Sequence, residues 1–317
     1  MLTFPKEISV GIFYIGCSFA GYPFFFVAFY LDNRIKNRTF VRRYRIPTMP
    51  QSAQYTEKVS VIMPTYNESQ LLVESIRSIL SQTYTNIELL ITDDASPNAE
   101  VRNRLLQLQQ EDSRVRLFFL DTNYGPGLAR NISIEKAEGR YIAFCDSDDC
   151  WTPDKVERQV AFMQKKGCAL SYTSYLRRDP EGKIVGVVNA PKKLTLRNLR
   201  HDNKIGCSTA MYDTKPYGKF FMPTLRKRQD WALFLTIMKK CGVAYGLQEP
   251  LTYYCIRPGS VSKGRASLVK YNAAVYQQIL GYSKLHSYLY LFFIFMPHYL
   301  LKKLKIRIDS LRYKRPS

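Results

Sequence analysis

The stretch that decides the fold lies at residues 141–149 and reads Tyr141-Ile142-Ala143-Phe144-Cys145-Asp146-Ser147-Asp148-Asp149. Its apolar first half predicts a buried strand, and carboxylates follow at once. Because residues two apart in an extended segment project to the same side, Asp146 and Asp148 can converge on one object. Such carboxylates suit a hard divalent cation, Mg²⁺ or Mn²⁺, with phosphate oxygens completing its shell. The alternative is an acidic turn that only caps a following helix, for which Thr152 would be the N-cap and Pro153 the first residue.

Segments with strand and helix patterns alternate on the amino-terminal side of this stretch. Strands are expected at residues 58–63, 87–91 and 115–120, and helices at residues 69–80, at residues 101–108 and from Gly125 onward. This alternation implies right-handed crossovers and a mostly parallel sheet. Ligands of such sheets bind at the carboxyl ends of the strands, where this chain places polar clusters. The sequence therefore predicts an α/β domain with a binding site along one edge of its sheet.

Seven motifs occur in an order that is typical of one family. They are Val59 to Glu68, Asp93-Asp94-Ala95-Ser96, Gly125 to Asn131, Tyr141 to Trp151, Gly206 to Tyr212, Arg228-Gln229-Asp230-Trp231 and Arg257 to Ser262. With this ordered set, which covers roughly residues 57–265, the chain resembles the inverting glycosyltransferases of family 2. The resemblance implies the GT-A fold, with a Rossmann-like, mostly parallel sheet that binds a nucleotide sugar and flanking helices.

The resemblance also implies which residues bind the donor. Asp148 would be the main metal ligand, and Asp146 would face the ribose or a metal-bound water. Asp149 would support the loop. The other residues expected at the nucleotide sugar are Pro64, Thr65, Tyr66, Glu68, Asp94, Arg130, Ser147, Arg257, Ser260 and Ser262. Two alternatives stay open: Asp93-Asp94 as an Asx-turn, and Arg130 as a salt-bridged helix residue.

The catalytic base implied by the resemblance is Asp230. It stands where a helical apolar stretch begins, so the alternative is an acid that only stabilises the helix amino terminus. Family members commonly carry Glu before this Asp, and here Gln229 replaces it. With Asp230 accepting a proton from an acceptor hydroxyl, transfer would be a single displacement that inverts the anomeric centre.

Charge and cysteine content limit the remaining possibilities. The 317 residues carry a net charge of +21, with basic clusters directly after the apolar runs Ile8 to Leu31 and Tyr288 to Leu301. Cations beside apolar segments favour an anionic membrane surface over nucleic acid. The seven cysteines show no zinc-ligand spacing and are expected to be reduced thiols.

The two apolar runs predict membrane association. Ile8 to Leu31 is long enough to cross a bilayer as one helix, or it could lie in the membrane plane. The cations that follow it place the catalytic domain on the cytoplasmic face of the cytoplasmic membrane. Tyr288 to Leu301 is too short to span comfortably and predicts an interfacial helix bent by Pro297, with a docked core helix as the alternative.

These expectations define four segments and a function. The segments are a membrane segment (1–33), a basic linker (34–56), a catalytic domain (57–265, divided into a nucleotide-sugar half at 57–150 and an acceptor half at 151–265) and amphipathic helices with a basic tail (266–317). We expect a metal-dependent, inverting glycosyltransferase that uses a UDP-sugar and a lipid-linked or saccharide acceptor in cell-surface polysaccharide or glycolipid synthesis. The alternatives are a polyprenyl-phosphate glycosyltransferase and a non-catalytic module that binds nucleotide sugar or lipid.

Overall fold

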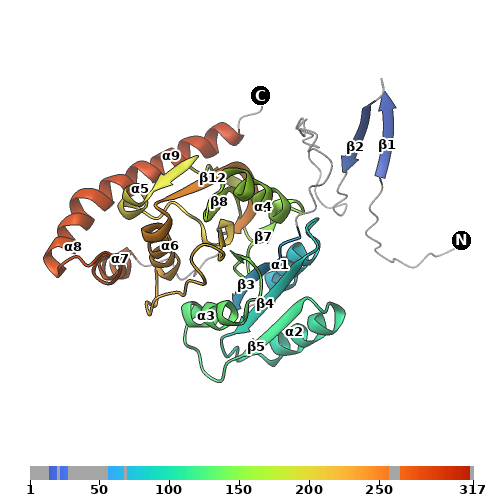
Figure 1. Cartoon of the computed structure of the whole chain (residues 1–317), viewed down its shortest axis with the longest axis horizontal. Coiled ribbons are helices and arrows are strands. Elements are labelled where there is room, and N and C mark those ends of the chain that lie inside the picture. The colour runs from blue at the N-terminus through green and yellow to red at the C-terminus, as the bar shows by residue number, and fades with distance from the viewer. Residues whose placement is uncertain (1–13, 20–21, 28–55, 68–69, 257–264, 315–317) are drawn as a thin grey trace, which may run out of the picture. The chain divides into compact units, whose positions relative to one another are not determined.

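A computed structural model describes residues 14–19, 22–27, 56–67, 70–256 and 265–314 (Figure 1). The chain divides into two compact units, residues 1–52 and 53–317. In the first unit, β1 (Tyr14–Phe19) and β2 (Tyr22–Val27) pair antiparallel, with Gly16 opposite Phe25. The prediction of one helix over Ile8 to Leu31 is therefore wrong for these residues, because glycine and proline weaken a helix and the aromatic residues favour strands. No helix in the described part of the chain has the length and apolar character needed to cross a bilayer.

The second unit is built on a ten-stranded sheet with the order β10-β12-β8-β11-β6-β3-β4-β5 along its main path. Its first half confirms the predicted alternation, since four parallel strands come from this half. In chain order the elements are β3 (Val59–Thr65), α1 (Gln70–Leu80), β4 (Ile87–Asp93), α2 (Ala99–Glu111), β5 (Val115–Phe119), α3 (Pro126–Lys136) and β6 (Tyr141–Phe144).

The second half makes the sheet mixed rather than wholly parallel. Its elements are β7 (Cys150–Trp151), α4 (Lys155–Lys166), β8 (Leu170–Arg178), β9 (Ile184–Val188), β10 (Lys193–Thr195), α5 (Leu196–His201), the 3-10 turn η1 (Cys207–Thr209), β11 (Met211–Asp213), α6 (Gln229–Cys241) and β12 (Val243–Cys255). β11 lies antiparallel between β6 and β8, whereas β12 runs parallel to β8. The long strand β12 therefore extends the sheet beyond the nucleotide half.

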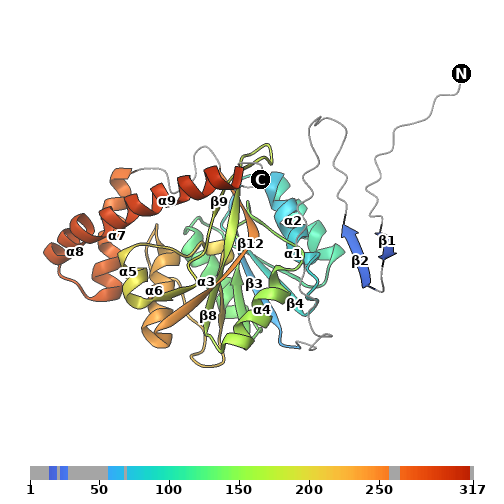
Figure 2. The ribbon, with the colours of Figure 1, turned by 90° about the horizontal axis from the view of Figure 1, so that it is seen from above.

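Alternating side chains of the strands feed two cores, and helices lie on both faces of the sheet (Figures 1 and 2). On β3, Val61 and Met63 pack with α1, α2 and α4, while Ile62 points to the opposite core with α3, α5 and α6. Both faces are covered by helices, as a sheet of buried apolar strands requires. The polar strand ends are consequently the part of the sheet left open for chemistry.

The helix α4 starts later than the sequence predicts. Thr152 is not its N-cap, because α4 begins at Lys155 and Asp154 is the residue before it. Trp151 pairs with Thr252 of β12, and the Thr152 amide donates to the Leu251 carbonyl at 3.0 Å. Pairing with β12 therefore holds residues 150–152 in the sheet and delays the helix.

The chain ends in helices that pack on the catalytic unit. They are α7 (Arg265–Leu280), α8 (Lys284–Tyr290), the π-helical turn η2 (Leu291–Phe295) and α9 (Met296–Lys314). The Met296 amide donates to Leu291 O, five residues back, directly before Pro297. A proline removes one helical hydrogen bond, and a π-turn is a common way to absorb that loss. Leu291 and Phe295 reach the core beside Trp231, so the inner side of this run is a docked core helix.

Candidate active site

The polar clusters predicted at the strand ends lie along one edge of the sheet. β3, β4 and β6 are parallel neighbours, and Thr65 stands opposite Asp93 in their register. The Asp94 amide donates to the Thr65 carbonyl at 2.9 Å, and the Cys145 amide donates to the Ile62 carbonyl at 3.1 Å. The loops that follow all three strands therefore begin side by side, as the carboxyl ends of parallel strands must.

Three carboxylates gather after β6, and their surroundings differ. The Asp146 carboxylate is partly exposed and accepts a hydrogen bond from Arg130 at 2.5 Å. Burial and then the neighbouring charge of Asp146 raise the pKa of Asp148 to about 7. Burial and then the charges of Asp148 and Asp146 raise the pKa of Asp149 well above its ordinary value. Burial and mutual repulsion thus make the charged forms of Asp148 and Asp149 costly in this loop.

Asp149 supports the loop, as the resemblance implies. Its side chain is 1% exposed. One oxygen accepts from the Ser208 hydroxyl at 2.5 Å, and the other accepts from the Cys255 amide at 3.0 Å. Asp149 therefore joins the loop after β6 to η1 and to the end of β12. These two contacts leave Asp146 and Asp148 as the carboxylates of the loop that can face a ligand.

Ser208 is a central residue of the site that the sequence reasoning did not single out. Its hydroxyl also accepts from the Asp146 amide at 3.1 Å, and its carbonyl accepts from the Trp151 indole at 2.9 Å. One residue of η1 thus fixes both ends of the acidic loop. The motif from Gly206 to Tyr212 was visible in the sequence, but its partners lie about sixty residues away and had no local signal.

Arg130 connects the acidic loop to the expected base. Its side chain is buried in α3 and donates to Asp146. The structure therefore shows the alternative reading, in which Arg130 is a salt-bridged helix residue. Burial disfavours its charge, but neighbouring groups that include Cys207, Asp146 and Asp230 raise the pKa of Arg130. The guanidinium therefore stands within electrostatic reach of carboxylates on both sides of the site.

Asp230 lies in the first turn of α6, which begins at Gln229 as the sequence predicts. Asn203, which follows α5, donates its side-chain amide to Asp230 Oδ2 at 3.0 Å. This contact was not foreseen, because nothing in the local sequence links two residues twenty-seven positions apart. Gln229 is buried against Gly127, where an added Cβ would stand 3.0 Å from Gln229 Cγ. The amino-terminal turns of α3 and α6 therefore meet, and Gly127 permits that approach.

The expected nucleotide residues after β3 and β4 form a second group. Asp94 is buried, and its two oxygens accept the amides of Tyr124 at 2.8 Å and Gly125 at 2.7 Å. Asp94 thus orders the loop before α3. Burial raises the pKa of Asp94, although the hydrogen bonds from the two amides act in the opposite direction. Tyr66 is 51% exposed and available to a ligand, while the Thr65 hydroxyl is buried without a hydrogen-bond partner among the described residues.

Some expected contacts cannot be placed. Glu68, Arg257, Ser260 and Ser262 lie outside the described residues, and their roles stay predictions. Within the described ranges, no group of three or more His, Cys, Asp or Glu side chains is arranged to hold a metal. The pair Asp146 and Asp148 still fits one, because burial and the neighbouring Asp146 raise the pKa of Asp148, and a bound cation would stabilise its charged form. Such a site would need ligands from a bound phosphate as well.

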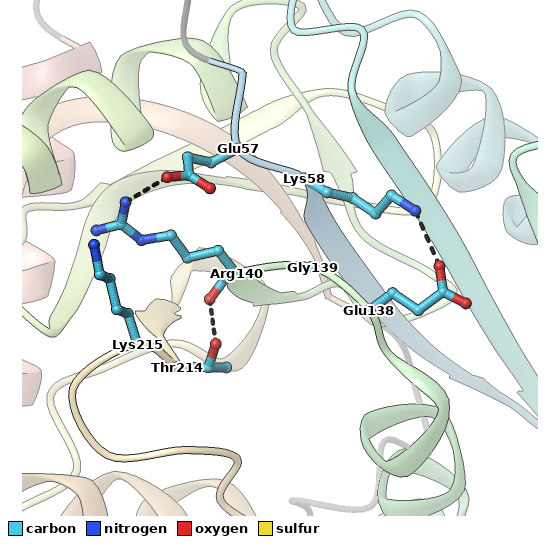
Figure 3. Close-up of a pocket in the computed structure, with 7 residues that line it drawn as sticks. All are labelled: Glu57, Lys58, Glu138, Gly139, Arg140, Thr214 and Lys215. Atoms are coloured by element: carbon cyan, nitrogen blue, oxygen red, sulfur yellow. Dashed lines mark hydrogen bonds and ion pairs between the residues drawn. The ribbon is translucent and has the colours of Figure 1, made fainter.

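A pocket of about 480 Å³ lies at the opposite end of the strands (Figure 3). Glu57, Lys58 and Arg140, which directly precede β3 and β6, line it. Arg140 pairs with Glu57 at 2.8 Å and with Asp213 at 2.7 Å, and Lys58 pairs with Glu138 at 3.0 Å. Because its charges are largely paired and it faces away from the acidic loop, we assign the chemistry to the carboxyl ends.

Comparisons with known proteins agree with this geometry. The model of glycosyl transferase family 2 matches residues 60–218. TuaG of Bacillus subtilis (strain 168), named as a teichuronic acid biosynthesis glycosyltransferase, is 37% identical over 222 residues, which span 70% of this chain and 88% of TuaG. WfgD of Escherichia coli, a UDP-Glc:α-D-GlcNAc-diphosphoundecaprenol β-1,3-glucosyltransferase by name, is 39% identical over 181 residues, or 57% of this chain and 70% of WfgD.

The fold is also shared with solved structures. The crystal structure of S. aureus TarS residues 1–349 in complex with UDP superposes with a TM-score of 0.54 at 20% identity and covers 73% of this chain and 68% of that one. At this identity the likeness concerns the GT-A-like fold alone. From the family match and the two bacterial relatives, the chain belongs to glycosyl transferase family 2 and is a glycosyltransferase.

Proposed function

We propose that this enzyme transfers a sugar from a UDP-sugar to a lipid-linked glycan, with inversion at the anomeric carbon, in the synthesis of a bacterial surface polysaccharide. The observation that carries the proposal is the position of Arg130 between two sets of carboxylates. Its partner Asp146 belongs to the loop expected to bind the donor, and Asp230, on the expected acceptor side, contributes to its electrostatic surroundings. An inverting transfer needs these two functions close together.

On the donor side, the residues after β3, β4 and β6 bind the nucleotide. Tyr66 offers an exposed ring for the base, and the loop that Asp94 orders closes the site beside it. Asp148 and Asp146 would hold a Mg²⁺ or Mn²⁺ ion, whose positive charge would offset that of the diphosphate leaving group. Arg130 limits the repulsion between Asp146 and a second anion.

On the acceptor side, Asp230 accepts the proton of the attacking hydroxyl. Its carboxylate is held at one oxygen by Asn203, so the other oxygen is the one oriented toward the acceptor. A positioned carboxylate of this kind typically accelerates a displacement by about 10²–10⁴-fold. No covalent intermediate is required, because the nucleophile is the acceptor hydroxyl itself.

The acceptor class rests on the bacterial relatives. WfgD is named for an acceptor that carries diphosphoundecaprenol, and TuaG for teichuronic acid synthesis. A lipid-linked acceptor requires the enzyme to work at a membrane, and we place the catalytic unit on the cytoplasmic face, where nucleotide sugars are made.

The test is a donor screen that uses bacterial lipid extract as the acceptor and measures release of the nucleoside diphosphate. We expect release with a UDP-sugar, loss of release in chelator and recovery with Mg²⁺ or Mn²⁺. NMR of the product should show the anomeric configuration opposite to that of the donor. Retained configuration would refute the single displacement, and full turnover in chelator would refute the metal requirement.

A further inference from the structure

The outward side of the carboxyl-terminal helices exposes many large apolar side chains. In α8 and η2 they are Leu285, Leu289, Phe292 and Phe293, and in α9 they are Met296, Leu300, Leu301, Leu304, Ile308 and Leu311. Their exposed fractions range from 36% for Met296 to 73% for Phe293. Single exposed leucines are common on soluble proteins, but a continuous row of this length marks an interaction surface.

The row forms one stripe along α9. At about 100° per residue, its six α9 members fall within a sector of about 140°. The opposite side of the helix is the docked one: Ser310 is buried and exchanges hydrogen bonds of 3.2 Å with the amide and carbonyl of Val187 in β9. Gly186 permits this approach, because an added Cβ there would collide with the Ser310 side chain. Packing on β9 therefore fixes the stripe outward, and both views show α9 along the outside of the unit (Figures 1 and 2).

Cations flank the stripe on both sides. By the same helical geometry, Lys303 stands just beyond one margin and Lys305 and Arg312 beyond the other, while Arg307 falls inside the sector, close to the first margin. The one acid between residues 284 and 314 is Asp309, which lies toward β9 and accepts from Asn189 at 3.1 Å. An apolar stripe between two rows of cations matches the interface of an anionic bilayer, where acyl chains meet phosphate headgroups. A second copy of the chain would bring the same cations together and repel.

Helix α9, which carries this stripe, also contacts the loop after α5, and this loop contains the residue that bonds the expected base Asp230. Lys302, on the docked side of α9, lies 2.6 Å from a carboxylate oxygen of buried Asp202 and donates to the Asn203 carbonyl at 2.7 Å. The Asn203 side chain in turn donates to Asp230. Two hydrogen bonds, through Lys302 and Asn203, therefore link the helix of the stripe to the acceptor side of the site.

We propose that the apolar stripe of α8, η2 and α9, with its flanking cations, is a docking surface for an anionic lipid bilayer. This deepens the proposed function, since a lipid-linked acceptor lies in such a bilayer. The docking proposal can be tested separately, because it concerns contact with lipid and not transfer of sugar. Failure of the lipid test leaves the donor screen untouched, and failure of the donor screen leaves lipid contact measurable.

The test uses the full chain and vesicles that contain about one third phosphatidylglycerol and a trace of photoactivatable phosphatidylglycerol. Lipid-modified peptides are then mapped by mass spectrometry. We expect modification within residues 285–311, and we expect the double variant Leu300→Glu with Leu304→Glu to reduce it at least tenfold. Leu106→Glu, at an exposed leucine of α2, is the matched control and should change nothing. Equal circular dichroism spectra and melting temperatures confirm that the variants fold.

Three results would overturn the proposal. The first is lipid modification that misses residues 285–311, which would assign membrane contact to another part of the chain. The second is equal modification of the double variant. The third is a vesicle-free dimer that the same double variant turns into a monomer, because the stripe would then be an interface between copies. Two further results would overturn the role of the cations. One is equal lipid modification with vesicles of pure phosphatidylcholine, and the other is unchanged modification of the variant Lys303→Glu with Arg307→Glu.

Discussion

The two ends of the parallel strands carry charge in opposite ways. At the amino ends, Arg140 is matched by Glu57 and Asp213, so opposite charges stabilise each other. At the carboxyl ends, Asp146, Asp148 and Asp149 stand together, and burial and then repulsion from Asp146 raise the pKa of Asp148 to about 7. The amino end contains an open pocket of about 480 Å³, yet its charges are largely paired. A buried cluster of like charges is the better guide to the active site, because its charged form has a cost that a bound cation would offset.

The largest effect should come from the acidic loop. Asp148→Asn should lower transfer to background, because the main metal ligand is lost. In chelator at pH 8 the same variant should melt at an equal or higher temperature than the parent. The reason is that a carboxylate whose pKa is raised in the fold costs free energy above its unfolded pKa, and the amide removes that cost.

The matched control is Asp154→Asn, a partly exposed carboxylate that pairs with Arg158 outside the cluster. It should keep near-parental activity. An active Asp148→Asn enzyme, or one that melts well below the parent in chelator, would mean that this carboxylate is structural and that the two strand ends do not differ as described.

The next largest effect should come from the base. Asp230→Asn should lower turnover by about 10²-fold or more, since the amide cannot accept the acceptor proton. Donor affinity, measured by isothermal titration with the nucleotide, should stay within about threefold of the parent. Lost donor binding with retained turnover would move Asp230 from the acceptor side to the donor side.

A smaller effect should follow from loss of the contact that orients the base. Asn203→Ala should lower kcat about fivefold to tenfold, which corresponds to one hydrogen bond of about 1 kcal/mol. Donor KM should not change, because the hydrogen bonds of Asn203 within the described residues go to Asp230, Ile205 and Lys302, outside the donor loops. Asn189→Ala, which removes the amide bonded to Asp309, is the control and should leave kcat unchanged. Equal losses in both variants would indicate general destabilisation.

The smallest effect on activity should come from the amino-end pocket. Arg140→Leu should lower the free energy of unfolding by about 1–2 kcal/mol, because Asp213 and Glu57 lose their partner at a partly exposed site. Its kcat should stay within about twofold of the parent. Arg104→Leu controls for the loss of a positive charge. The exposed Arg104 side chain donates one hydrogen bond, to Gln107, within the described part of the chain. A tenfold loss of kcat in a folded Arg140→Leu enzyme would make the pocket functional.

The sequence by itself determined the nucleotide half and the positions of its polar strand ends. Strands β3, β4, β5 and β6 and the start of α6 at Gln229 follow from short-range apolar patterns, which depend on neighbours within one turn or one strand. The support role of Asp149, implied by the resemblance, was also confirmed. Roles that depend on a bound ligand, such as those of Tyr66 and Asp148, stay predictions.

The tertiary structure decided what local patterns could not express. Pairing with β12 delayed the start of α4, and β1 with β2 replaced the expected helix in the residues described there. Ser208 and Asn203 became site residues through contacts dozens of positions apart along the chain. Packing of Ser310 on β9 selected which side of α9 is buried and which remains exposed. Such choices arise from long-range packing and hydrogen bonding, whose free energy exists only when distant segments meet.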